Sequence, residues 1–216
     1  MNRLPLTVAF ASPERTPLFR AGPIGHALTV GLALIVLLSS AALALADDWS
    51  VAALMAELAQ HKTGTAHFVE TRYLAVLDAP LVSSGELSFS APDKFVKSTL
   101  RPKPERLELD GDTVQIDRGR QHLSVELGEH PELGALVESI RATLNGDRQV
   151  LEQNYAVTLS GTRQKWVLGL VPRDARVLAV ISRVTLSGSG GLLGLVEYQQ
   201  ADGDRSVMAI DNVGGQ

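Results

Sequence analysis

The chain has 216 residues, a formal charge of −4 at pH 7 and no cysteine, and 45% of its residues are hydrophobic. The absence of cysteine excludes disulfide bonds, thiolate zinc sites, a cysteine nucleophile and a lipidated cysteine. The length and composition are typical of one globular domain with a sizeable core, and the acidic balance disfavours nucleic acid and anionic membrane surfaces as partners.

The first 46 residues are organised like a secretory signal peptide. Three arginines precede an apolar run over residues 27–46, which ends in Ala-Leu-Ala before two aspartates. A basic lead, an apolar middle and a small-residue exit predict cleavage after Ala46 and export to the periplasm. The alternative is a retained membrane anchor, because about 20 apolar residues can just span a bilayer. Without the three Arg and one Glu of this segment, residues 47–216 carry 17 basic and 23 acidic side chains, a net charge of −6, and are expected to form one domain.

The first element expected in this domain is a helix over residues 48–62, capped by Asp48. Val51, Leu54, Met55 and Leu58 recur there at helical spacing, and a Thr-Gly pair follows as a stop. From that point the apolar residues recur with period two between Gly, Pro, Asn and Asp breaks. The expected strands cover residues 65–77, 84–90, 94–101, 104–110, 113–118 and 121–127.

The sequence ERLELDGDTVQIDR, residues 105–118, predicts a β-hairpin in a defined register. With Gly111-Asp112 as its two-residue loop, two apolar and two charged pairs face each other: Leu109–Val114, Leu107–Ile116, Arg106–Asp117 and Glu105–Arg118. The alternative loop, one residue earlier, would place Leu109 against Asp112 and is therefore disfavoured. A glycine at the first loop position also suits a type II′ turn.

A second amphipathic helix is expected over residues 131–145. Its apolar stripe consists of Leu133, Leu136, Val137, Ile140 and Leu144, and Gly146 is the expected C-terminal stop. Period two then returns and predicts strands near residues 155–159, 166–170, 178–186, 192–199 and 205–213. About eleven strands and two clear helices predict an α+β fold, with a large antiparallel sheet and helices on one face.

The polar residues form no catalytic or metal-binding pattern. The five histidines include no pair at the i, i+4 spacing of a helical metal site, and no G-x-S-x-G motif is present. The two Asp-Gly-Asp sequences, at 110–112 and 202–204, and the run SGSGGLLG at 187–194 are typical of turns, because they lack the further ligands of calcium and phosphate loops. We therefore expect no enzymatic activity, no metal and no cofactor. A hydrolase would need a Ser–His pair within hydrogen-bond reach, which a sequence does not show.

Several landmarks follow one another in a defined order between residues 68 and 111. Phe-Val-Glu at 68–70 is followed seventeen residues later by Gly-Glu-Leu at 85–87, then by Pro92, Pro102 and Asp-Gly at 110–111. This order resembles the periplasmic outer-membrane lipoprotein carrier family, the LolA type, which has Phe-x-Gln at the first landmark. A weaker similarity extends over the mature chain as a leading helix, a helix near 131–145 and closing strands. The chain resembles a divergent member.

The resemblance implies a half-open, strongly curved antiparallel sheet of about eleven strands, an incomplete β-barrel whose concave face is covered by helices. It further implies that acyl chains bind between the sheet and the helices. The partners it implies are an acylated lipoprotein, lipid or glycolipid as cargo, an inner-membrane exporter as donor and an outer-membrane acceptor. We favour lipid or glycolipid export over a general lipoprotein shuttle, and we expect a monomer with no nucleic-acid partner.

We expect the hydrophobic cavity implied by this resemblance to be lined by fifteen side chains of the predicted strands and of the second helix. They are Leu87, Phe89, Ala91, Phe95, Leu107, Leu109, Val114, Ile116, Leu133, Leu136, Val137, Ile140, Trp166, Leu168 and Leu170. Period-two alternation cannot by itself separate a cavity wall from a filled core. The competing hypothesis is an envelope sensor or assembly protein that uses the same fold as a protein-interaction module, with an interior filled by its own side chains.

Two positions depart from the pattern of the family. The residue before the proline of the second strand is commonly an Arg that hydrogen-bonds to helix carbonyls and holds the lid closed, but here it is Ala91. The position five after that proline is often aromatic, but here it is Lys97. Lys97 is expected to reach the rim, to meet an acidic lipid headgroup, or to lie at a solvated strand edge. These two departures argue against lipoprotein transfer through the family's usual cycle of partner proteins. They do not argue against the binding of a hydrophobic cargo.

Overall fold

The structure is a computed structural model, and it describes residues 49–213. The expected signal peptide over residues 1–46 lies outside the described residues. Eleven antiparallel strands form one sheet in the order β6-β5-β4-β3-β2-β1-β11-β10-β9-β8-β7. Their bounds are β1 (Thr63–Tyr73), β2 (Leu81–Ser90), β3 (Lys94–Arg101), β4 (Glu105–Asp110), β5 (Thr113–Arg118), β6 (Gln121–Glu126), β7 (Tyr155–Thr162), β8 (Lys165–Pro172), β9 (Ile181–Ser189), β10 (Leu192–Gln200) and β11 (Arg205–Asn212).

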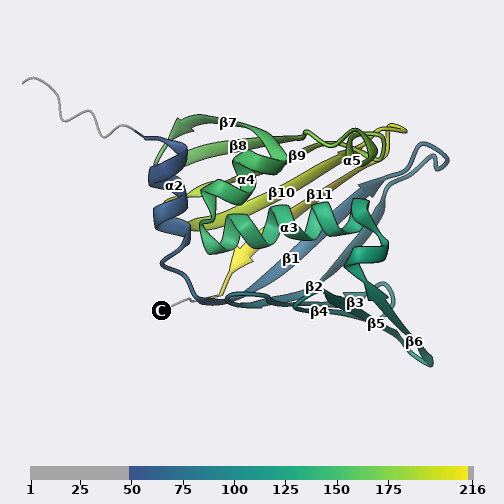
Figure 1. Ribbon diagram of the computed structural model, residues 1–216. Helices are drawn as coiled ribbons and strands as arrows, with labels where there is room; N and C mark the ends of the chain where they lie inside the picture. The colour runs from purple at the N-terminus through teal and green to yellow at the C-terminus, as the bar shows by residue number, and fades with distance from the viewer. Residues whose placement is uncertain (1–48, 214–216) are drawn as a thin grey trace, which may run out of the picture. The chain divides into compact units, whose positions relative to one another are not determined.

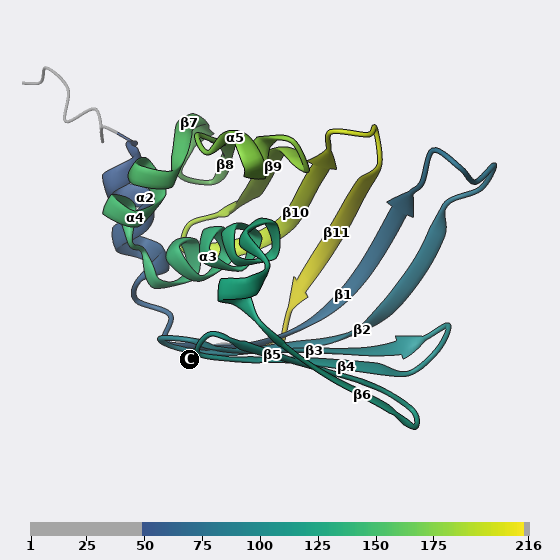
Figure 2. The same cartoon turned by 45° about the vertical axis from the view of Figure 1, so that its right-hand side comes forward.

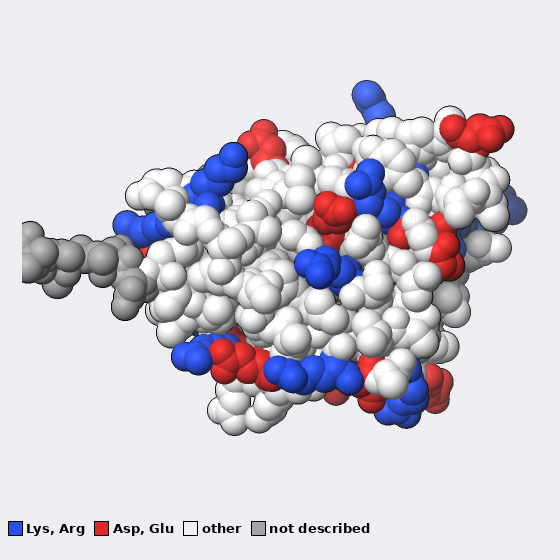
Figure 3. Space-filling view, turned by 90° about the horizontal axis from the view of Figure 1, so that it is seen from above, with Lys and Arg blue, Asp and Glu red and all other residues white. Residues whose placement is uncertain are grey.

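The sheet is open, because β6 and β7 end it without pairing with each other. Figures 1 and 2 show that it curves strongly and that the helices lie on its concave side. The predicted α+β fold with a half-open curved sheet is thus confirmed. On the face seen in Figure 3, acidic and basic side chains are interspersed between large uncharged areas. Within residues 49–213, no helix has the length and apolar character needed to span a membrane.

Four α-helices and one 3-10 helix belong to the described residues. They are α2 (Val51–Leu58), η2 (Leu127–Glu129), α3 (Pro131–Asn145), α4 (Arg148–Asn154) and α5 (Ala175–Leu178). The start and end of α3 match the prediction, since Pro131 begins it and Gly146 ends it in the left-handed conformation at φ +71°. In α2, Ser50 replaces the expected Asp48 as N-cap, with its Oγ accepting from Ala53 N at 3.2 Å.

The sequence analysis missed α4 and α5. They have seven and four residues, which is too short for a helical period to become visible. Asp147 and Asp174 cap their first turns, because each carboxylate accepts from backbone N–H groups that have no partner inside the helix. The expected strand over 65–77 was also too long: residues 74–80 form the connection to β2, with Leu77 N donating to Leu74 O at 3.0 Å.

The hairpin β4–β5 has the predicted register. Leu109 lies opposite Val114, Leu107 opposite Ile116 and Arg106 opposite Asp117. Arg118 also contacts Glu105 through an ion pair. Gly111 has φ +60°, a conformation that favours glycine and explains why the loop begins there.

The largest hydrophobic cluster lies between α2, α4 and the strands β7–β10. Its most deeply buried side chains come from α2, α4, β8 and β9: Leu54, Met55 and Leu58 of α2, Leu151 of α4, Trp166, Leu168 and Leu170 of β8, and Val184 and Leu186 of β9. A smaller cluster of Leu109, Val114 and Leu127 lies at the other end of the sheet. The concave face between these two clusters is covered by α3.

Candidate functional site

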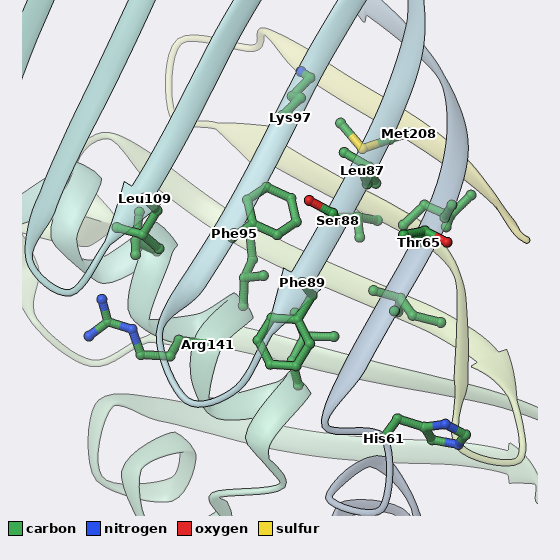
Figure 4. Close-up of a pocket in the computed structure, with 18 of the residues that line it drawn as sticks. His61, Thr65, Leu87, Ser88, Phe89, Phe95, Lys97, Leu109, Arg141 and Met208 are labelled. Carbon is green, nitrogen blue, oxygen red and sulfur yellow. The ribbon is translucent and has the colours of Figure 1, made fainter. Parts of the chain in front are cut away.

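An apolar cavity of about 300 Å³ lies beneath α3, on the concave side of the sheet. Most of its wall comes from α3 and from strands β1–β4, β10 and β11. Figure 4 shows the side chains of Leu87, Phe89, Phe95 and Leu109 gathered along neighbouring strands of this wall. The cavity is the feature of the described residues that offers space for an apolar ligand.

Strand pairing explains why the sheet side of this wall is apolar. Phe89 lies opposite Phe95, which lies opposite Leu109 in the next strand. These three side chains therefore form one row across β2, β3 and β4. Because side chains alternate between the two faces of a sheet, residues two positions along the same strands also face the cavity. They form the row Leu87, Lys97 and Leu107, in which the central residue is charged.

Helix α3 supplies the opposite wall. Its apolar stripe recurs every three or four residues and faces the sheet, so that Leu133, Leu136, Val137, Ile140 and Leu144 all line the cavity. The helix is also tied to two hairpin turns of the sheet. Arg141 donates to the carbonyl of Gly111, and Asn145 Nδ2 donates to the carbonyl of Pro92 at 2.7 Å. These bonds hold α3 over the cavity at its C-terminal half.

Nine of the fifteen side chains expected at the cavity lie in its wall. They are Leu87, Phe89, Phe95, Leu107, Leu109, Leu133, Leu136, Val137 and Ile140. The other six lie outside it: Trp166, Leu168 and Leu170 belong to the filled cluster under α2 and α4, Val114 and Ile116 to the smaller cluster at β4–β5, and Ala91 to the turn after β2. Apart from Ala91, these residues lie on the inward face of the sheet, as alternation predicts, but alternation does not indicate which part of that face is filled.

Ala91 lies in the turn after β2, where the alternation of the strand has ended. β2 ends at Ser90, and the Ala91 amide donates to the carbonyl of Lys62 at 2.7 Å. The next two residues, Pro92 and Asp93, do line the cavity. The period of β2 was therefore extended one residue too far when Ala91 was placed on the face of Leu87 and Phe89.

The sequence analysis did not select the part of the wall formed by β10 and β11. Leu193, Val196 and Tyr198 of β10 and Met208 and Ile210 of β11 line the cavity. Met208 and Ile210 follow the period of the strand expected at 205–213, so the face of the sheet on which they lie was predictable from the sequence. The sequence does not show that β11 pairs with β1, and this pairing brings β11 to the cavity.

Charged and polar side chains form a connected group in the wall. The Nζ of Lys97 lies 2.5 Å from Oε2 of Glu70, and the second carboxylate oxygen of Glu70 accepts from Ser206 Oγ at 2.6 Å and from Tyr198 OH at 3.3 Å. Glu70 and Ser206 are buried, at 3% and 1% exposure. Every one of the three donors therefore stabilises the charged form of Glu70.

The pKa values of this group follow from its burial and contacts. Burial by itself raises the pKa of Glu70, but the charge and hydrogen bond of Lys97 and the hydrogen bond of Ser206 outweigh it, so the pKa lies below its ordinary value of 4.5. Burial raises the pKa of Tyr198, although the Ser206 hydrogen bond opposes this. At neutral pH the carboxylate is thus ionised and the phenol is neutral.

Among the residues from 49 to 213, no three His, Cys, Asp or Glu side chains gather as they would around a metal ion. His61 lines the cavity at the end away from Lys97, as Figure 4 shows. What the arrangement can do is exclude water from an apolar ligand and offer polar contacts at one end.

The sequence of the chain is similar to a known protein family. A family model described as "Outer membrane lipoprotein carrier protein LolA-like" matches residues 40–211. A search of curated protein sequences finds no match.

Three solved structures are among those similar to this chain. A LolA superfamily protein from Nitrosomonas europaea has 9% identity and a TM-score of 0.39, covering 76% of this chain and 93% of its own. A DUF1329 family protein from Desulfovibrio piger has 11% identity and a TM-score of 0.42, covering 77% and 92%. The lipoprotein LppX from Mycobacterium tuberculosis has 9% identity and a TM-score of 0.39, covering 77% and 99%. These likenesses are distant, and the family assignment rests on the sequence match.

Proposed function

The chain belongs to the outer membrane lipoprotein carrier protein LolA-like family, and on that premise we propose that it is a carrier that binds an acyl chain in the cavity beneath α3. The cargo is an acylated lipoprotein, a lipid or a glycolipid, taken from an inner-membrane exporter and delivered toward an outer-membrane acceptor. The protein works in the periplasm as a monomer after cleavage of its signal peptide behind Ala46. Its role is binding and transfer, with no chemical step on the cargo.

The single observation that carries this proposal is the unfilled cavity between α3 and the sheet. Its volume of about 300 Å³ is at the lower end of the range of small-molecule sites. Its wall combines two phenylalanines of β2 and β3 with the leucines of α3 and β4. Each methylene group that such a wall removes from water contributes about 0.8 kcal/mol, so a long acyl chain can be held by burial alone.

Loading requires α3 to move, because this helix covers the cavity. The contacts from Arg141 to Gly111 and from Asn145 to Pro92 hold its C-terminal half on the sheet. Both acceptors are carbonyls in hairpin turns, and the hydrogen bond from Asn145 is exposed to water. Breaking bonds of this kind costs little, because water replaces the lost partners. Opening and closing of the helix therefore provides a route for the cargo without a nucleotide.

The proposal is tested on protein purified from the periplasm without added lipid. We expect native mass spectrometry and organic extraction to detect an acyl ligand, and added acyl ligands to raise the unfolding temperature of stripped protein, since a ligand that binds only the folded state stabilises it. Protein that retains no lipid and gains no thermal stability from acyl ligands would contradict the proposal. A detergent of matching chain length serves as the control for non-specific stabilisation.

One observation favours the alternative, a protein-interaction module of the envelope. The connection between β1 and β2 and the first residue of β2 expose large apolar side chains, with Val76 at 89%, Leu81 at 48% and Leu77 at 45% exposure. Figure 2 shows this hairpin at the end of the sheet away from α2. Exposed apolar groups of this size are typical of contact surfaces. Replacing Val76 and Leu77 by serine distinguishes the two functions. A carrier keeps its lipid occupancy in this variant. A pure interaction module carries no lipid before or after the replacement, and the variant loses its partner.

A further inference from the structure

The end of the cavity marked by Lys97 is built differently from the rest of its wall. Lys97 lies in the row between Leu87 and Leu107, two apolar neighbours on β2 and β4. Figure 4 shows it on the side of Leu87 and Met208, away from His61. Its side chain is only 20% exposed, and that of Glu70 only 4%. An apolar cavity thus contains one nearly buried ion pair.

Both oxygens of the Glu70 carboxylate have hydrogen-bond donors. Its two oxygens accept from Lys97, Ser206 and Tyr198, at 2.5, 2.6 and 3.3 Å. The pKa of Glu70 lies below 4.5, so Glu70 stays ionised and balances the charge of Lys97. The pair therefore presents no net charge to the cavity.

The ammonium group of Lys97 keeps hydrogen-bonding capacity. A lysine ammonium has three N–H donors. One donates to Glu70, and the Nζ also lies 5.0 Å from the centre of the Phe68 ring, which offers the face of its π system. Lys97 itself lines the cavity. A donor of Nζ is thus placed to meet an acceptor atom carried by a ligand.

We propose that the Glu70–Lys97 pair recognises the ester or amide carbonyl of an acyl ligand and discriminates against a free carboxylate. The carbonyl oxygen accepts a charge-assisted hydrogen bond from Lys97 Nζ while the hydrocarbon chain occupies the apolar part of the cavity. A free fatty acid would bring a full negative charge into the apolar cavity, where the charge of Lys97 is already balanced by Glu70, so the cost of removing that charge from water is not repaid. This inference rests on the proposed function and narrows its cargo to acyl chains that are still esterified or amide-linked.

The energetics of burial argue for a ligand role of the pair. Removing two charges from water costs several kcal/mol for each ion, and well-packed apolar side chains of similar volume are often equally or more stable. The neighbours of Lys97 in its row, Leu87 and Leu107, are both apolar. Recognition of a polar atom of the ligand explains why a charged pair lies among them. Apolar side chains could not provide this recognition.

The test compares three ligands of equal chain length by isothermal titration calorimetry, each below its critical micelle concentration. They are 1-monolauroyl-glycerol, its ether analogue 1-O-dodecyl-glycerol, which lacks only the carbonyl oxygen, and dodecanoate. We expect the ester to bind about tenfold more tightly than the ether, the ratio for one hydrogen bond to a charged group, and dodecanoate to bind most weakly. This comparison uses the unmodified protein and so does not depend on the folding of a variant.

Variants then show whether the pair is responsible. The double variant Glu70→Gln/Lys97→Met avoids a lone buried charge, and we expect its ester-to-ether ratio to fall to about one. The matched control is Lys94→Met on the same strand, because Lys94 forms an exposed ion pair with Asp110 at 2.8 Å and does not line the cavity. We expect this control to keep the tenfold ratio. Unfolding curves without ligand check that both variants fold.

Four outcomes overturn the inference. Equal binding of ester and ether to the unmodified protein, or tightest binding of dodecanoate, removes it and leaves the proposed carrier function intact. A tenfold ratio that persists in the double variant assigns carbonyl recognition to another group. If none of the three ligands binds, the proposed function itself is wrong, and the inference falls with it.

Discussion

The two halves of the concave face contain similar side chains but differ in what covers them. The half formed by β7–β9 is covered by α2 and α4, and Trp166, Leu168, Leu170, Val184 and Leu186 are fully buried there. The half formed by β1–β4 is covered by α3 alone, and its leucines and phenylalanines surround the cavity. The sheet offers an apolar face throughout, and the number and placement of the helices decide where that face becomes a core and where it becomes a binding site.

Leu168→Ala in the filled half has the largest expected effect. Leu168 is 0% exposed, and its neighbours cannot collapse into the space that the substitution leaves. We expect the free energy of unfolding to fall by about 2–5 kcal/mol, the range of such core substitutions. Denaturant unfolding measures it, and a loss below about 1 kcal/mol would show that this half is not a tightly packed core.

Leu107→Ala is the matched substitution in the other half. Leu107 already faces the cavity, so truncation enlarges an existing space and leaves fewer packing contacts to lose. We expect a loss of stability of about 1 kcal/mol or less, together with weaker acyl binding, because about 0.8 kcal/mol is lost for each methylene left without its wall contact. A stability loss as large as that of Leu168→Ala, with unchanged ligand affinity, would remove the distinction between the halves.

Acid pH affects the cavity half through Glu70. Its pKa is lowered by folding, so its contribution to stability is complete above its ordinary value of 4.5 and is lost as the pH falls through the lower folded value. We expect stability to decrease on acidification below about pH 4.5, and to decrease less in the double variant Glu70→Gln/Lys97→Met. Urea unfolding at several pH values measures this difference. Parallel curves for the two proteins would show that the ion pair contributes nothing to acid sensitivity.

Ala91→Arg has the smallest expected effect. Ala91 lies in a turn and does not line the cavity, although the neighbouring Pro92 carbonyl accepts from Asn145 of α3. We expect a change in stability within about 0.5 kcal/mol and nearly unchanged ligand affinity, as for substitutions away from packed sites. Strongly reduced lipid loading would instead show that an arginine at this position reaches α3 and holds it closed.

Much of the fold was predictable because local chemistry determines it. Period two located the strands, Gly111 fixed the β4–β5 register, and Pro131 and Gly146 delimited α3. The two short helices α4 and α5 left no periodic signal. The pairing of β1 with β11, which joins residues more than a hundred positions apart, follows from the tertiary arrangement and from no local pattern.

The candidate site was predictable only in part, for a related reason. Alternation identifies which side chains face inward, and it correctly grouped Phe89 with Leu87 and Leu107 with Leu109. It cannot show that α2 and α4 fill the space over Trp166 and Leu168, while α3 leaves space over Phe95. The ion pair of Lys97 was equally hidden, because its partner Glu70 lies 27 positions earlier in the chain and reaches it across β2.

The most direct test of the central claim, that the space beneath α3 holds an acyl chain, is native mass spectrometry of the Ile140→Trp variant beside the unmodified protein. Ile140 projects from α3 into the cavity, and an indole at this position would occupy the space of the ligand. We expect the unmodified protein to carry an acyl ligand and the folded variant to carry none. Equal lipid occupancy in both proteins, or the absence of lipid from both, would contradict this account.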